Sequence, residues 1–127
     1  EKTKQFIYKI RTCNYTIEDK KFDLYAFNAE VENFLKNQLF DEKRINKVLL
    51  VCEELIYNCI FKGFGDKSVP VEFTLQYSQQ KDETEITFAG ELINGSLIDK
   101  ADAMSMDIVR KSVKKISGDD NKLTVSL

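Results

Sequence analysis

Three polar side chains, those of Glu54, Asn58 and Lys62, recur every four residues within CEELIYNCIFKGFG, residues 52–65. On a helix this spacing places them side by side along one row. An asparagine amide oxygen is a hard, neutral ligand for Mg²⁺, and a carboxylate one turn earlier can orient or deprotonate a hydroxyl or water that attacks a phosphate. A lysine one turn later can neutralise phosphate charge. The row suits phosphoryl transfer, but polar residues at the edge of an apolar helix stripe commonly have no catalytic role.

The residue types of the chain exclude several other classes of site. None of the 127 residues is histidine, which removes Ser-His-Asp and Cys-His catalysis, histidine-ligated metals and phosphohistidine chemistry. The three cysteines include no C-x-x-C pair, which argues against a disulfide or zinc framework. Cys52 and Cys59 lie within an apolar helix stripe, so we interpret them as reduced thiols in the core of a cytoplasmic protein.

The charge balance gives no reason to expect a nucleic-acid partner. Lysine and arginine together number 19 and the acidic residues 21, a formal net charge of −2, so there is no basic surplus to bind a phosphate backbone. No apolar run approaches the length of about 20 residues that a membrane helix needs, and no stretch has the pattern of a signal peptide. We therefore expect no membrane partner.

The stretch GFGDKS, residues 63–68, is similar to a phosphate-binding P-loop only at first sight. A P-loop needs a lysine directly after its second glycine and a helix that opens on the following serine or threonine. Here Asp66 intervenes and a predicted strand follows. We reject this interpretation.

Apolar periodicity predicts the elements that must position the row. The predicted elements are a strand over 5–12, a helix over 21–39, a second helix capped by Asp41 and ended by Gly63, a hairpin of strands 69–78 and 84–90, a third helix over 101–114 and a closing hairpin over 114–127. This order predicts one α+β domain over residues 1–127, a two-layer α/β sandwich with a mixed, mostly antiparallel sheet and three helices on one face.

The helix LLVCEELIYNCIFKGF resembles the N-box helix of the histidine-kinase-like (GHKL, Bergerat-fold) ATPases. The likeness is closest to the anti-sigma-factor serine kinase branch, in which E-x-x-x-N-x-x-x-H/K-G/A is typical, and the order of elements extends it over nearly the whole chain. The resemblance implies that Glu54 is the catalytic base, that Asn58 is the Mg²⁺ ligand, and that Lys62 lies near the phosphates. It also implies ATP and Mg²⁺ as cofactors.

Two further nucleotide motifs of that family are degraded in this chain. FAGELING, residues 88–95, retains Gly90, Ile93 and Asn94 but has Phe88 where the family has the aspartate that accepts a hydrogen bond from the adenine amino group. AMSM, residues 103–106, aligns with the G-L-G-L phosphate motif, so Ala103 and Ser105 add a Cβ where glycine lets backbone N–H groups approach phosphates. The resemblance therefore implies weakened or lost ATP binding.

Three functions are compatible with these residues. The resemblance implies a regulatory domain that acts through protein partners, with a sigma factor or a small phospho-regulated antagonist domain as the candidate partners. The alternative is an active Mg-ATP-dependent serine/threonine protein kinase in a sigma-factor pathway, and the third is an unrelated α+β domain in which the E-x-x-x-N spacing is accidental. In the ATPase fold, Glu54 and Asn58 face a cleft bounded by residues 88–106, and a side chain such as Phe88 or Met104 within it would favour the regulatory domain. The sequence leaves a homodimer open.

Overall fold

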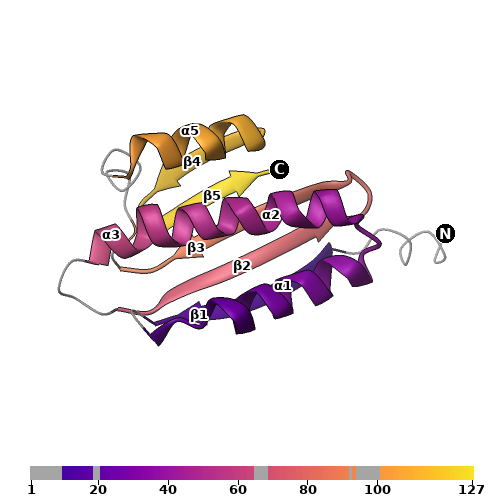
Figure 1. Ribbon diagram of the computed structural model, residues 1–127, viewed down its shortest axis with the longest axis horizontal. Helices are drawn as coiled ribbons and strands as arrows, with labels where there is room; N and C mark the ends of the chain where they lie inside the picture. The colour runs from indigo at the N-terminus through magenta and orange to yellow at the C-terminus, as the bar shows by residue number, and fades with distance from the viewer. Residues whose placement is uncertain (1–9, 19–20, 65–68, 92, 94–100) are drawn as a thin grey trace.

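Five strands form a sheet in the order β1-β2-β3-β5-β4 (Figure 1). The computed structural model describes residues 10–18, 21–64, 69–91, 93 and 101–127. The strands are β1 (Ile10–Ile17), β2 (Val71–Ser78), β3 (Glu83–Ala89), β4 (Lys115–Asp119) and β5 (Lys122–Ser126). All four pairings between neighbouring strands are antiparallel.

Helices cover one face of this sheet, as Figure 1 shows. They are α1 (Leu24–Asn37), α2 (Glu42–Leu55) and α5 (Ala103–Ser112), and α2 continues without a break into η3 (Ile56–Ile60) and α3 (Phe61–Phe64). The arrangement confirms the predicted fold class, an α+β protein with a two-layer α/β sandwich.

The hydrophobic core lies between the two layers. Every second residue of β2 is buried, and α1 buries Phe27, Val31 and Leu35 at the four-residue spacing of one helix face. The Phe73 ring on β2 lies between the rings of Phe27 and Phe88, at centroid distances of 4.8 and 5.4 Å. Such tilted and edge-to-face pairs add to the stabilisation from buried area.

Several element boundaries differ from those predicted. Of the strand predicted over 5–12, residues 5–9 lie outside the described residues, and the strand continues to Ile17 because its alternating apolar side chains still reach the core. The first helix begins at Leu24 rather than at residue 21, since the Asp23 carboxylate accepts a hydrogen bond from the backbone N–H of Ala26. The cap predicted at Asp41 is confirmed, with the Arg44 N–H donating to its carboxylate at 2.8 Å.

One polar cluster ties the start of α2 to the turn between β2 and β3. Arg44 donates to the Asp82 carboxylate through Nη1 at 2.9 Å and to the Asp82 carbonyl through Nη2 at 3.2 Å. The Tyr77 hydroxyl donates to the same carboxylate at 2.7 Å, and the Arg44 guanidinium lies 3.9 Å from the centroid of the Phe40 ring. Helix and hairpin are thereby joined by charge-assisted hydrogen bonds and a cation–π contact.

This cluster predicts that the protein loses stability in acid. Hydrogen bonds from Tyr77 and Arg44 lower the pKa of Asp82, so the folded state favours the ionised carboxylate. The resulting stabilisation is present above the ordinary aspartate pKa of about 4 and disappears as the pH falls through the lower folded pKa. We expect urea midpoints measured from pH 6 to pH 2.5 to fall less for Asp82→Asn than for the unmodified protein. Asparagine suits the left-handed backbone of this residue (φ 50°), so the substitution adds no backbone strain. An equal fall in the urea midpoints of the two proteins would contradict the prediction.

Candidate functional site

The structure brings Glu54 and Asn58 together as their spacing predicts. Both side chains are half-buried at the edge of the apolar stripe, and the Asn58 amide donates a hydrogen bond from Nδ2 to Glu54 Oε2 at 3.0 Å. Because the amide nitrogen is used in this bond, the Asn58 side-chain oxygen points away from the carboxylate, and it is the atom suited to a hard cation. Lys62 is exposed in α3, one turn farther along the helix.

Asn58 lies inside a π-helical turn, which sequence reasoning missed. The turn covers Ile56–Ile60, and the backbone N–H of Phe61 donates to the Ile56 carbonyl five residues earlier. Single π-helical turns are rare and are found frequently at functional sites. The segment IYNCI contains no proline or glycine that could have signalled it.

The N-terminus of α5 docks onto this turn. The backbone N–H of Asp102 donates to the Asn58 carbonyl at 3.3 Å, so the predicted metal ligand and the predicted phosphate motif are neighbours. Residues 103–106 form the first turn of α5, in which Ala103 and Met104 are exposed and Ser105 is buried. Met104 is 73% exposed and so fills no interior space.

The Asp102 carboxylate caps this helix. Its Oδ2 accepts a hydrogen bond from the Ser105 backbone N–H at 3.1 Å, and that bond lowers the pKa of Asp102, with a smaller contribution from the positive charge of Lys62. A helix N-terminus is a ready site for an anion because its first N–H groups lack partners within the helix. Here the protein's own carboxylate takes that position, a contact that the sequence analysis did not predict.

Phe88 is a core residue. The resemblance places it at the adenine anchor, but its side chain has no exposed surface and packs against Phe73. It pairs across the sheet with Leu123 of β5, which is also buried. The structure therefore places the Phe88 ring in the hydrophobic core, and a contact between residue 88 and a nucleotide stays a prediction of the resemblance.

Gly90 has a packing role that explains its residue type. A Cβ built on it would lie 2.9 Å from the Pro70 carbonyl oxygen, closer than real Cβ atoms approach backbone oxygens. The Gly90 N–H donates to the Asn121 carbonyl at 2.9 Å, and its own carbonyl accepts from the Ile93 N–H at 3.1 Å. Asn94, the other retained residue of this motif, lies outside the described residues.

Gly90→Ala is accordingly expected to lower the free energy of unfolding by about 1–3 kcal/mol, because the backbone around Pro70 has to move. Urea denaturation would measure the change. Gly118→Ala, at an exposed position of strand β4, is the matched control and should change stability little. Equal stabilities of Gly90→Ala and the unmodified protein would show that the strand end relaxes without cost.

Two of the three cysteines lie on the apolar stripe of the α2–η3 helix, and the third, Cys13, lies on β1. Cys52 and Cys59 are buried and Cys13 is half-buried, and burial raises the pKa of the Cys59 thiol to about 11. Within the described ranges, no group of three or more histidine, cysteine, aspartate or glutamate side chains is arranged to hold a metal ion. A cation at Asn58 would thus take most of its ligands from phosphates and water, as Mg²⁺ commonly does.

Among the helices that the structure describes, none is long and apolar enough to cross a membrane. No protein-family model matches the chain, and no curated protein matches its sequence.

Proposed function

We propose that the protein is a regulatory domain that resembles the anti-sigma serine kinases and acts through protein partners, with weakened or lost ATP binding. The observation that carries this proposal is the Asp102 carboxylate, which caps α5 directly beside Asn58. An ATP phosphate approaching this helix N-terminus would have to displace a carboxylate that already holds the Ser105 N–H, and would meet its negative charge.

The adenine side of the site supports the same proposal. The buried Phe88 ring offers no acceptor for an adenine amino group. A site that lacks one buried hydrogen bond loses about 1–3 kcal/mol, or roughly one to two decades of affinity. Because both ends of the nucleotide are disfavoured, the resemblance favours action through a protein partner, with a sigma factor or a small phospho-regulated antagonist domain as the candidates.

Calorimetric titration with ATP, with and without Mg²⁺, tests the proposal. The unmodified protein is expected to give no binding heat at millimolar ATP, because Asp102 repels the phosphates. Asp102→Ser removes this charge but retains a capping oxygen, so it should gain measurable affinity. Asp23→Ser, which changes the equivalent cap of α1, is the matched control and should gain none. Micromolar, Mg²⁺-dependent binding by the unmodified protein would overturn the proposal.

The hydrogen bond between Glu54, in the last turn of α2, and Asn58, in the π-helical turn that follows, favours the second candidate, an active Mg-ATP-dependent serine/threonine kinase. If this candidate is correct, Asn58→Ala abolishes the Mg²⁺-dependent part of ATP affinity, because it removes the cation's amide ligand. The exposed Asn46, on the same helix, provides the control substitution Asn46→Ala, which should leave affinity unchanged. Calorimetry of both variants measures the difference, and an unchanged affinity for Asn58→Ala would exclude the ligand role.

A further inference from the structure

A second surface lies at the corner between α1 and α2, at the opposite end of the α2–η3 helix from Asn58 (Figure 1). Leu39 lies in this corner with 92% of its surface exposed. Its backbone adopts a left-handed conformation, φ 65°. The Leu39 N–H donates a hydrogen bond to the Lys36 carbonyl at 3.0 Å, and the Phe40 N–H donates one to the Leu35 carbonyl at 3.1 Å. Helices that end in this way usually have glycine at the left-handed position.

Leucine is therefore energetically unfavourable at this position. Its Cβ is crowded in the left-handed conformation, and its side chain remains in water, where it contributes nothing to the core. A strained backbone conformation that no packing contact of the side chain offsets is a reason to look for a function. The exposed side chain gains stabilisation only when another molecule covers it.

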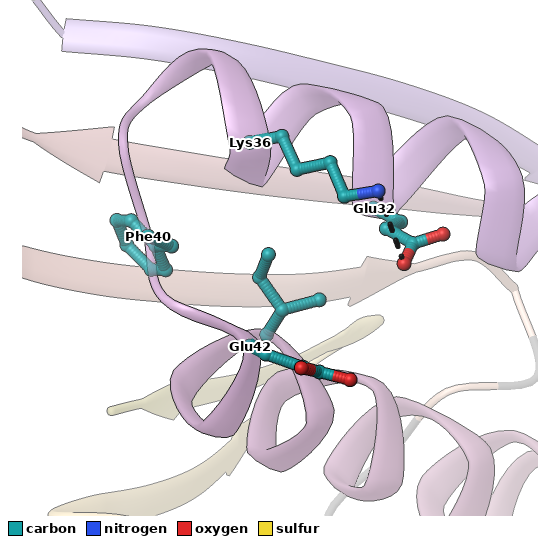
Figure 2. Close-up of a pocket in the computed structure, with 5 residues that line it drawn as sticks. Glu32, Lys36, Phe40 and Glu42 are labelled. Atoms are coloured by element: carbon teal, nitrogen blue, oxygen red, sulfur yellow. Dashed lines mark ion pairs between the residues drawn. The ribbon is translucent and has the colours of Figure 1, made fainter.

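A cavity of about 310 Å³ opens between α1 and the first turn of α2, and Phe40, the residue that follows Leu39, forms part of its lining. Figure 2 shows Glu32 and Lys36 on the α1 side, joined by an ion pair, with Phe40 in the connecting turn and Glu42 across from them. Phe40 and Ile45, which are 8% and 3% exposed, provide its apolar lining. The volume is at the lower end of the range for ligand pockets, and one long side chain of a partner fits into it.

The charges that line the cavity favour a basic side chain. Glu32 is paired with Lys36 at 3.6 Å, and both side chains are well exposed. Glu42 makes no ion pair with any described residue, so the lining carries one negative charge in excess. A lysine or arginine suits this combination, because its alkyl stem can lie on Phe40 and Ile45 while its charged head reaches the carboxylates.

We propose that the corner formed by Glu32, Lys36, Leu39, Phe40, Glu42 and Ile45 docks a protein segment that carries arginine or lysine beside apolar residues. The basic side chain enters the cavity between Glu32 and Glu42, and an adjacent apolar side chain of the partner packs on Leu39. Leu39 becomes buried only in the complex, where it contributes apolar contact area, and Glu42 orients the basic side chain.

This inference rests on the proposed function for its expectation of a protein partner, but the two can fail separately. Micromolar Mg²⁺-dependent ATP binding would overturn the proposed function and leave this corner untouched. Failure of the corner to select a basic peptide would overturn the inference. It would have no bearing on whether the protein binds ATP.

The test uses the intact chain, labelled with ¹⁵N, and a blocked hexapeptide of alternating leucine and arginine. We expect saturable amide shifts concentrated in residues 32–45, and at least tenfold weaker binding of the same peptide with glutamate in place of arginine. Glu42→Gln should weaken binding severalfold, and Glu85→Gln, on an exposed strand position, should not. Leu39→Gly should weaken it about tenfold, the loss of one anchor residue, whereas Tyr25→Ala, at a residue that is 88% exposed, should have no effect.

Stability measurements keep the Leu39 result interpretable. Glycine relieves the left-handed strain, so Leu39→Gly should be at least as stable to urea as the unmodified protein, and its weaker binding then cannot come from unfolding. Equal binding of the arginine and glutamate peptides, shifts located elsewhere, or full affinity of Leu39→Gly would each overturn the proposal. A concentration-dependent dimer that Leu39→Gly dissociates would assign the corner to a second copy of the chain, and would also overturn it.

Discussion

Leu55→Asp is expected to unfold the protein at neutral pH. Leu55 has no exposed surface and lies on α2 within the hydrophobic core. Loss of a buried leucine costs about 2–5 kcal/mol, and an unpaired buried carboxylate adds several more. Their sum approaches the whole stability of a typical domain, about 5–15 kcal/mol. Far-UV circular dichroism and urea denaturation would show the loss of cooperative unfolding.

Leu50→Asp is the matched control for this experiment. Leu50 lies on the same helix but is 41% exposed, so the same substitution should cost less than about 1 kcal/mol. A soluble Leu55→Asp protein that unfolds cooperatively would contradict the phase of α2, and with it the placement of Glu54 and Asn58 at the edge of the apolar stripe.

Phe88→Asp is expected to have the second large effect, and it decides between two roles for this position. If residue 88 bordered an adenine pocket, the aspartate would restore the family's hydrogen-bond acceptor and increase ATP affinity. In the structure the new carboxylate would instead be buried beside Phe73 and Leu123, so we expect a loss of several kcal/mol of stability and no gain in ATP binding.

Urea denaturation and ATP calorimetry of the same Phe88→Asp preparation would measure both quantities. Phe88→Leu, which retains an apolar side chain, should cost only about 1 kcal/mol. Met104→Asp places the same charge on an exposed residue of α5 and should leave the fold intact. A folded Phe88→Asp protein with increased ATP affinity would restore the adenine-anchor assignment.

Much of the fold was predictable because its signals are local. The alternation along β2 and the apolar stripe of α2 follow directly from periodicity, and their order determined the fold class. The end of α1 was not predictable, because the left-handed residue after it is Leu39, whereas glycine or asparagine is the usual signal. The predicted helix continued to residue 39, but the structure ends it at Asn37.

The candidate site was predictable only where it depends on a single helix. The contact between Glu54 and Asn58 follows from their spacing. The π-helical turn and the contact between Asp102 and Asn58 depend on how α5 packs against α2, which no local pattern reports. The burial pattern of β3 places Phe88 on the same face as Ile86, but alternation along a strand cannot distinguish a core position from the wall of a cleft. Whether the chain binds ATP stays a prediction.

The two buried thiols on the α2–η3 helix, those of Cys52 and Cys59, can report local opening of this helix. Cys52 lies in the regular α-helical part, and Cys59 lies inside the π-helical turn that carries Asn58. A thiol reacts with an alkylating reagent only when the structure around it opens, so each cysteine reports the opening of its own turn. A higher alkylation rate for Cys59 than for Cys52 corresponds to a π turn that opens without the rest of the helix. Equal rates correspond to a helix that opens as one cooperative unit, with the π turn as firmly held as the core.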